Sequence, residues 1–256
     1  MRAVEKVVVK RSRDVALHEP QLNGNEKKYL AECIDTGWVS SVGPFVDRFE
    51  SDLASYTGSK RAVAVVNGTA ALHLALVLAG VQRGDEVLLP SLNFVATANA
   101  VTYCGAVPHF CEVEARTLGL DVESFARYLA GIAQSRAEGT FNASTGRRIA
   151  AVVPMHTFGH PVDLDPLMDI CARYKIPLVE DAAESLGSLY KGRHTGTFGR
   201  VAALSFNGNK IVTCGGGGAV LTDDPDLGAQ AKHLSTTARV KNTLEFSHDS
   251  IGFNYR

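Results

Sequence analysis

The sequence lacks the features that would place it in a membrane or in an oxidising compartment. Its five cysteines are odd in number, scattered and without a Cys-x-x-Cys pair, which argues against a disulfide framework and a zinc site. No stretch approaches the roughly eighteen uninterrupted apolar residues of a membrane span, and residues 1–14 contain no apolar core of a signal peptide. We therefore expect a soluble, cytoplasmic chain that is not exported.

An excess of one charge is also lacking. The formal net charge is −1 and no basic block is present, so neither a nucleic-acid partner nor an anionic membrane surface is indicated. The sequence contains no internal repeat and no low-complexity segment. With 256 residues, 45% of them hydrophobic, the chain can bury a large core.

Strand-like and helix-like segments alternate along the chain. Short β-branched runs predict strands at 61–66, 85–90, 107–114, 149–156, 176–183, 201–206 and 218–224. Helices are predicted at 25–35, 45–56, 67–80, 94–105, 166–174 and 225–234, with a further short helix after residue 121. The polar stretch 135–148 reads as a surface loop. This order predicts an α/β fold with a mostly parallel sheet, helices on both faces, and ligands bound beyond the carboxyl ends of the strands.

Three polar groups follow such strand ends. Asn67-Gly68-Thr69 opens a helix whose first amides could hold a phosphate, although plain N-capping explains the same residues. Asp181 ends a buried strand and needs a partner, which a salt bridge or a helix cap could equally supply. Lys210 lies in SFNGNKIVTCGGGG between a strand and four glycines, where an isolated lysine is usually only solvated.

Taken together, the three groups fit pyridoxal phosphate. This cofactor has a phosphate, a pyridine nitrogen that an acid keeps protonated, and an aldehyde that forms a Schiff base with a lysine. Asp181 would pair with the nitrogen, and Lys210 would hold the aldehyde and shuttle a proton. Phe94 is a candidate to stack on the ring, although an ordinary place in the core is the commoner fate of a phenylalanine.

Five motifs in order carry a resemblance to one family. NGTAALHLAL, PSLNFVATANAV, VEDAAESLGS, SFNGNK with its following glycines, and GFNYR resemble the DegT/DnrJ/EryC1/StrS sugar-nucleotide aminotransferases. The resemblance covers nearly the whole chain and implies the large domain of an aspartate-aminotransferase-like (fold type I) pyridoxal phosphate enzyme. It also implies that Lys210 is the Schiff-base lysine and Asp181 the partner of the pyridine nitrogen.

The resemblance assigns further residues by position. Gly68, Thr69 and Ser205 would bind the phosphate, with Asn207 reaching it directly or through water, and Phe94 would stack on the ring. Glu184, where relatives often have Gln or His, would lie near the phenolic oxygen. Asn254 resembles an asparagine that crosses to the partner subunit's phosphate, which implies an obligate homodimer with shared sites.

Within the family, GWVSSVGPFVDRFE and ALSFNGNKIVTCGGGG look most like enzymes that use L-glutamate to aminate C4 of a UDP-4-keto-6-deoxy-N-acetylhexosamine on the way to bacillosamine or legionaminic acid, in cell-surface glycan biosynthesis. Family members continue past GFNYR into a smaller C-terminal domain. We therefore expect an N-terminal arm at 1–24, a cofactor-binding large domain at 25–240, and the start of a connection to an absent small domain at 241–256.

The sequence also allows other functions and offers further candidate residues. A pyridoxal phosphate-dependent sugar dehydratase or lyase is one alternative, although family members that dehydrate have histidine in place of Lys210. A truncated, non-catalytic remnant of the fold is another. One of His156 and His160 is a candidate for a cofactor or substrate contact. Cys214 is expected to be a small core residue.

Overall fold

The computed structural model describes residues 18–240 and 245–256. Most of the expected N-terminal arm, and residues 241–244 of the expected connection, therefore lie outside the described residues, and the three domain ranges stay predictions. The helices are α2 (Glu26–Thr36), α3 (Pro44–Thr57), α4 (Gly68–Leu78), α5 (Val95–Tyr103), α6 (Val122–Ile132), the short η1 (Thr157–Gly159), α7 (Leu164–Tyr174) and α8 (Pro225–Ser235). The strands are β1 (Arg61–Val65), β2 (Glu86–Pro90), β3 (Val107–Cys111), β4 (Ala133–Arg136), β5 (Gly139–Asn142), β6 (Ile149–Val152), β7 (Val179–Asp181), β8 (Leu189–Tyr190), β9 (Arg193–His194), β10 (Val201–Ser205) and β11 (Gly218–Thr222).

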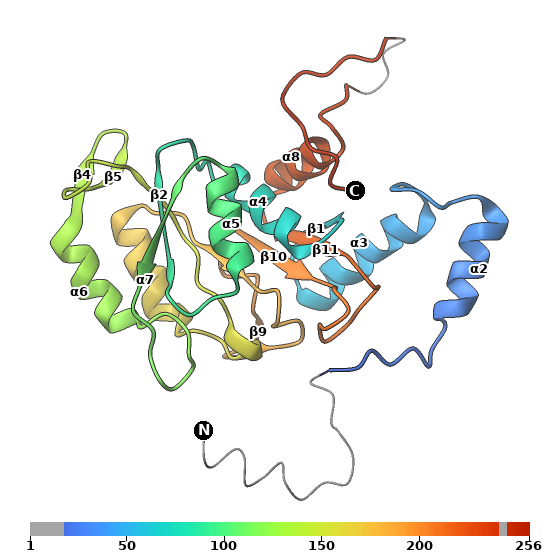
Figure 1. Cartoon of the computed structure of the whole chain (residues 1–256), viewed down its shortest axis with the longest axis horizontal. Helices are drawn as coiled ribbons and strands as arrows, with labels where there is room; N and C mark the ends of the chain where they lie inside the picture. Colours follow the sequence, from blue (N-terminus) through green and yellow to red (C-terminus); the bar gives the residue numbers. More distant parts are fainter. Residues whose placement is uncertain (1–17, 241–244) are drawn as a thin grey trace, which may run out of the picture.

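A mixed, mostly parallel sheet forms the centre of the molecule (Figure 1). One part has the order β1-β11-β10-β7 and the other the order β3-β2-β6. Parallel bridges from Val152 to Leu178 and from Met155 to Asp181 join β6 to β7, as expected for the βαβ unit at 149–183. β11 runs antiparallel to both β1 and β10, because it returns directly from β10 through the glycine-containing loop.

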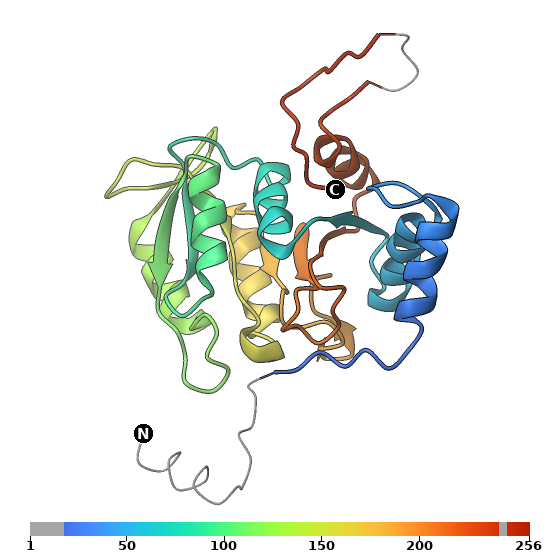
Figure 2. The same ribbon diagram turned by 45° about the vertical axis from the view of Figure 1, so that its right-hand side comes forward.

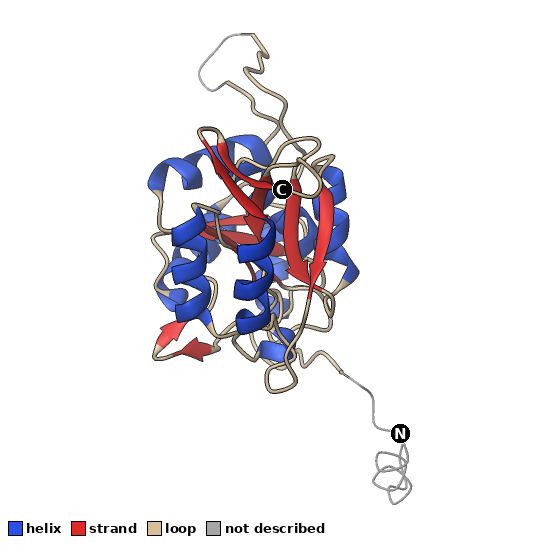
Figure 3. Cartoon of the chain, turned by 90° about the vertical axis from the view of Figure 1, so that its left-hand side faces the viewer, coloured by secondary structure: helices blue, strands red, loops and turns tan. Residues whose placement is uncertain are grey.

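Helices cover both faces of the sheet (Figure 3), as the sequence predicted. Successive side chains of a strand point to opposite faces. In β10, Ala203 accordingly packs in the cluster that contains α4, α5 and α8, whereas Leu204 packs in the cluster that contains Leu53 of α3. In β2, Leu89 packs in the first of these clusters and Leu88 packs with α6 and α7. Strands buried on both faces explain the nearly continuous apolar runs in the sequence.

The surface loop predicted at 135–148 is wrong over its first part and agrees with the structure at 143–147. Residues 133–142 form the antiparallel hairpin β4–β5, which turns at residues 137–138, and β5 begins at Gly139 with a φ of 134°. The polar composition favoured a loop, but two polar residues of β5 are buried in the structure and hydrogen-bonded to other segments. The Thr140 hydroxyl donates to the Tyr174 carbonyl at 2.5 Å, and the Asn142 amide donates to Glu86 at 2.9 Å. Four other strands end at least two residues earlier than predicted, at 111, 152, 181 and 222.

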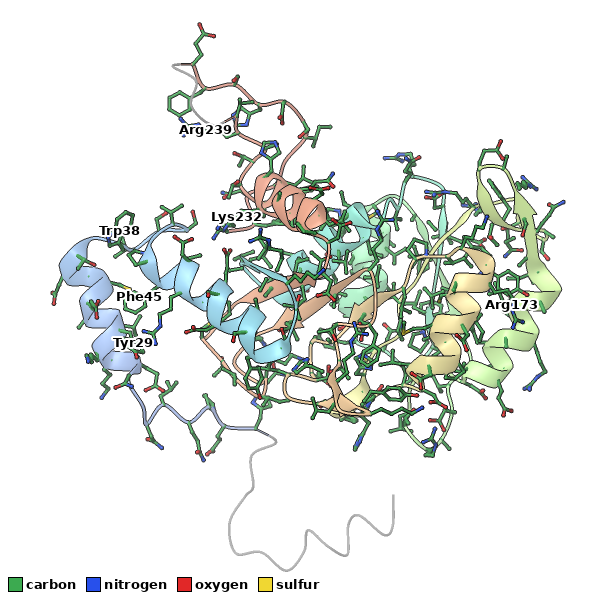
Figure 4. The ribbon with its side chains drawn as sticks, turned by 180° about the vertical axis from the view of Figure 1, so that it is seen from behind. Tyr29, Trp38, Phe45, Arg173, Lys232 and Arg239 are labelled. Carbon is green, nitrogen blue, oxygen red and sulfur yellow. The ribbon has the colours of Figure 1, made fainter. Side chains whose placement is uncertain are left out.

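The C-terminal residues and helix α2 differ in how closely they pack on the rest of the described chain. The C-terminal residues pack on the domain: the Val66 amide donates to the Tyr255 carbonyl at 2.6 Å, and the Tyr255 hydroxyl lies 2.9 Å from Nδ1 of His73. In contrast, α2 stands beside α3 at the edge of the molecule (Figure 2) and has no buried residue. Tyr29 of α2 contacts Phe45 of α3 with ring centroids 5.2 Å apart (Figure 4). None of the helices in the described part of the chain is long and apolar enough to span a bilayer.

Candidate functional site

Four connections bring polar or aromatic residues to the carboxyl ends of the parallel strands. The turn at 67–69 follows β1, Phe94 follows β2, Asp181 ends β7, and the loop with Lys210 follows β10. Because these strands run in the same direction, their carboxyl ends share one edge of the sheet, where α/β folds bind ligands. The structure therefore brings together the residues that the sequence singled out from four separate segments.

Lys210 lies in this site with its charge paired. Its Nζ is 2.9 Å from Oε1 of Glu184, and its side chain is 12% exposed. The other carboxylate oxygen of Glu184 accepts a hydrogen bond from the Phe158 amide at 3.2 Å. The ammonium also lies 5.9 Å from the centroid of the Phe94 ring. The sequence did not predict the ion pair or the role of the Phe158 amide, because these residues are distant in the chain.

Asp181 is buried, with 2% of its surface exposed. Oδ2 accepts a hydrogen bond from the Thr97 hydroxyl at 2.6 Å, and Oδ1 accepts one from the Ala183 amide at 3.2 Å. Burial raises the pKa of this carboxyl, and the hydrogen bonds from Thr97 and Ala183 and the nearby His156 and Lys210 only partly oppose that effect. The site thus holds a carboxyl that lacks full compensation for its charge.

Glu180, the preceding residue, points to the opposite face and is fully compensated. Its two oxygens accept hydrogen bonds from Nε2 of His156 at 3.0 Å and from the amides of Gly196, Phe198 and Gly199 at 2.7, 2.7 and 2.6 Å. Burial opposes ionisation, but the histidine and the amides outweigh it and lower the pKa of Glu180. Of the two adjacent carboxylates, Glu180 is therefore the structural one.

The turn after β1 has the geometry of an anion cradle. Asn67 caps α4, since its side chain accepts a hydrogen bond from the Ala70 amide at 2.8 Å. Within the described residues, the amides of Gly68 and Thr69 donate no hydrogen bond. A Cβ on Gly68 would lie 2.8 Å from Cβ of Ser205, so glycine allows the turn to approach the end of β10. Free amides at a helix N-terminus beside a serine hydroxyl fit the phosphate of pyridoxal phosphate.

Asn207 and Asn254, the two asparagines expected near the phosphate, lie in different parts of the structure. Asn207 is exposed, and its side-chain amide donates to Oδ1 of Asn209 at 2.8 Å. Asn254 is also exposed and lines a cavity of about 1070 Å³ whose lining includes none of Lys210, Asp181 and Phe94. A phosphate contact by Asn254 within its own subunit is therefore not supported.

His156, His160 and Cys214 differ in their exposure to solvent. His156 is fully buried, and its ring nitrogens lie 3.0 Å from Glu180 and 3.3 Å from the Val162 amide, so it supports the fold around Glu180. His160 is exposed. Cys214 is exposed as well, so the prediction of a core cysteine is wrong; its loop leaves the sheet before β11 begins. Among the described residues, no group of three or more His, Cys, Asp or Glu side chains could hold a metal ion.

Comparison with known proteins identifies the family of the chain. The model of the DegT/DnrJ/EryC1/StrS aminotransferase family matches residues 20–256. The chain belongs to this family. The resemblance seen in the motifs is thereby confirmed, as is the assignment to an aminotransferase family that uses pyridoxal phosphate.

Individual relatives of this DegT-family chain carry related names. It is 41% identical over 242 residues to a GDP-perosamine synthase of Caulobacter vibrioides, covering 94% of this chain and 61% of that protein. It is 39% identical over 242 residues to EpsN of Bacillus subtilis, named as a pyridoxal phosphate-dependent aminotransferase, covering 94% and 60%. The chain thus spans about three fifths of the length of these curated relatives.

A solved structure confirms the fold. The aminotransferase TlmJ from Streptoalloteichus hindustanus superimposes with a TM-score of 0.83 at 34% identity, covering 94% of this chain and 62% of that one. The aspartate-aminotransferase-like large domain expected from the motifs is therefore present. The comparisons concern the chain as a whole, so the roles of the individual site residues stay predictions.

The raised pKa of Asp181 predicts how the stability of the chain without cofactor depends on pH. A carboxyl with a raised folded-state pKa contributes stability below its unfolded pKa, and this contribution is lost as the pH rises through the folded-state value. Asp181→Asn removes this loss. We expect the unfolding free energy of the variant to exceed that of the wild type increasingly above about pH 4, by about 1.4 kcal/mol per unit of raised pKa.

Urea denaturation of both proteins across this pH range measures the difference. Glu180→Gln is the matched comparison, because the lowered pKa of Glu180 has the opposite sign and makes this variant the less stable one at neutral pH. A gap between wild type and Asp181→Asn that does not change with pH would contradict the raised pKa.

Proposed function

We propose that this chain carries the cofactor site of a pyridoxal phosphate-dependent aminotransferase, which transfers the amino group of L-glutamate to C4 of a nucleotide-linked 4-keto-6-deoxy sugar. The observation that carries the proposal is the meeting of Lys210, Asp181, Phe94 and the turn at 67–69 at one edge of the sheet. Each of these groups matches one part of the cofactor. Cell-surface glycan biosynthesis is the process in which we place this reaction.

Each residue would have a distinct task. The amides of Gly68 and Thr69, with the Ser205 hydroxyl, would bind the phosphate, and Phe94 would cover the ring. When bound, pyridoxal phosphate supplies an electron sink and a carrier for the amino group. Lys210 would hold the cofactor covalently and move a proton at the substrate carbon.

Glu184 would hold that lysine in the site. Its carboxylate lies 2.9 Å from Nζ of Lys210, and the two side chains form an ion pair. The Phe158 amide holds the other oxygen of Glu184 and would keep the carboxylate at the site.

For the nucleotide of the sugar substrate, the relatives favour a different base from the one expected. The relative from Caulobacter vibrioides is named a GDP-perosamine synthase, so its name gives a GDP-linked sugar. The motifs had suggested a UDP-linked, N-acetylated sugar, which this name does not support. We therefore propose a GDP-linked 4-keto-6-deoxy sugar for this chain and keep the UDP-linked sugar as the alternative to test.

A homodimer with shared sites is also part of the proposal. Asn254, which by resemblance would reach a phosphate, lines a cavity away from the site of its own subunit. Helix α2 exposes Leu30 and Ile34, and Ile34 is 71% exposed. An eleven-residue helix without a buried face is marginal alone, so a partner subunit that covers it would stabilise it. Both features support two copies of the chain that complete each other's sites.

The alternatives have less support. Lys210 argues against the dehydratase, because by resemblance that branch of the family has histidine at this position. A non-catalytic remnant is disfavoured because the paired Lys210 and the buried Asp181 are costly features that a remnant would not need. We therefore rank the aminotransferase first.

The role of Lys210 is tested by trapping the cofactor. After incubation with pyridoxal phosphate and reduction with borohydride, we expect the wild type to gain the mass of the reduced cofactor on the peptide containing Lys210. Lys210→Ala should gain none and lose activity by about 100-fold to 10,000-fold, the range for removal of a general acid–base. Mass spectrometry of the digest gives the result.

Lys60→Ala is the matched control, because Lys60 is an exposed lysine that immediately precedes β1. This variant should be labelled like the wild type. A label on a different lysine would overturn the assignment of Lys210, and an unlabelled wild type would overturn the cofactor site.

The substrate is tested with GDP-, UDP- and dTDP-linked 4-keto-6-deoxy sugars, each supplied with L-glutamate and cofactor. We expect 2-oxoglutarate and an aminated sugar with the GDP-linked compound, measured by coupled assay and mass spectrometry. Amination of only the UDP-linked, N-acetylated sugar would restore the original expectation. Loss of water from the sugar without use of glutamate would favour the dehydratase, and a labelled but inactive protein would favour the remnant.

The shared site is tested by mixing two inactive variants. In a mixed dimer of Lys210→Ala and Asn254→Ala, one site would carry both changes and the other would be intact. Random exchange should therefore restore about a quarter of the wild-type activity per total protein, since half of the dimers are mixed. Mixtures without any gain would show that Asn254 does not serve the partner's site.

A further inference from the structure

Thr97 is a buried polar residue whose side chain, among the described residues, is hydrogen-bonded to Asp181 alone. Its hydroxyl donates to Oδ2 of Asp181 at 2.6 Å, and both residues are buried, with 0% and 2% of their surfaces exposed. Thr97 lies in the first turn of α5, on the face of the sheet to which Asp181 points. A buried hydroxyl and a buried carboxylate that share one hydrogen bond are strongly coupled, because burial leaves neither of them solvent as a substitute partner.

Four groups act on the charge of Asp181 from the surrounding elements. They are the Thr97 hydroxyl of α5, the Ala183 amide, His156 before η1, and Lys210 of the loop after β10. Thr97 has the largest effect among those that favour the charged form, and its hydrogen bond is shorter than the 3.2 Å bond from Ala183. Burial acts against them. Loss of the Thr97 hydroxyl would therefore move Asp181 towards its protonated form.

The same turn of α5 also places Phe94. The Phe94 amide lies 3.4 Å from the sulfur of Met155, and Met155 pairs with Asp181 in a parallel bridge. The Thr97 amide donates to the Phe94 carbonyl at 3.1 Å. The start of α5 is thus attached to the sheet at two points that lie next to the carboxylate.

We propose that Thr97 is a positioning residue for Asp181: its hydroxyl keeps the buried carboxylate charged and in place for a protonated pyridine nitrogen. The inference deepens the proposed function and rests on it for the identity of that nitrogen. The coupling between Thr97 and Asp181 does not depend on the cofactor. Thr97 touches neither cofactor nor substrate in this scheme and acts only through Asp181.

Three substitutions separate the hydroxyl from the packing. Thr97→Val keeps the shape and removes the donor, whereas Thr97→Ser keeps the donor and removes a methyl group. Thr102→Val makes the same chemical change on the exposed side of the same helix, where the Thr102 hydroxyl donates to the Asn99 carbonyl. A purely structural role for Thr97 predicts that valine is tolerated at least as well as serine.

The first measurement uses the chain without cofactor. Thr97→Val should raise the pKa of Asp181 further, so more stability is lost as the pH rises through the higher folded-state pKa. We expect the gap in urea midpoint between wild type and Thr97→Val to widen from about pH 4 to about pH 8. The gaps for Thr97→Ser and Thr102→Val should stay nearly constant. A gap for Thr97→Val that does not depend on pH would overturn the inference.

The second measurement uses the chain with pyridoxal phosphate. Thr97→Val should bind the cofactor about tenfold to a hundredfold more weakly at neutral pH, as expected for loss of a hydrogen bond to a charged group, and Thr97→Ser should largely restore binding. Fluorescence titration measures both. Equal affinity of wild type and Thr97→Val would overturn the positioning role. A wild type that binds no cofactor would overturn the proposed function instead, while the pH-dependent gap would still test the coupling of Thr97 to Asp181.

Discussion

Two adjacent carboxylates at the end of β7 have to be buried without water, and the architecture around them follows from this constraint. The alternation of the strand sends Glu180 to one face of the sheet and Asp181 to the other. Glu180 is supplied with three amides from residues 196–199 and with His156, which lowers its pKa. The loop that leads into β10 is thereby attached to β7. Since β10 continues into the segment with Lys210, the compensated carboxylate helps to place the lysine.

Asp181 has a different balance. It accepts fewer hydrogen bonds than Glu180, and burial leaves its pKa raised. Such a carboxyl costs stability in the free protein, and in the proposed function it would gain a partner from a protonated nitrogen, which would contribute to affinity. The ion pair with Glu184 holds Lys210 near the ring of Phe94 at the same site.

Much of the fold was accessible from local patterns. The order of strands and helices, the parallel β6–α7–β7 unit and the helices on both faces agree with the prediction, because strands buried on both sides leave continuous apolar runs. The β4–β5 hairpin was missed, since Thr140 and Asn142 look like loop residues until Tyr174 and Glu86 supply their partners. Cys214 was misplaced because its neighbours in sequence do not show that the loop leaves the sheet.

The family could be inferred from the sequence because five motifs resemble it. The fit of Lys210, Asp181 and the turn at 67–69 to pyridoxal phosphate, and the edge of the sheet at which they meet, followed from residue type and strand direction, which are local properties. In contrast, the pairing of Glu184 with Lys210, the hydrogen bond from Thr97 to Asp181 and the full compensation of Glu180 were visible only in the folded chain. Those outcomes depend on which distant segment covers each face of β7, and side-chain spacing along the chain carries no information about that.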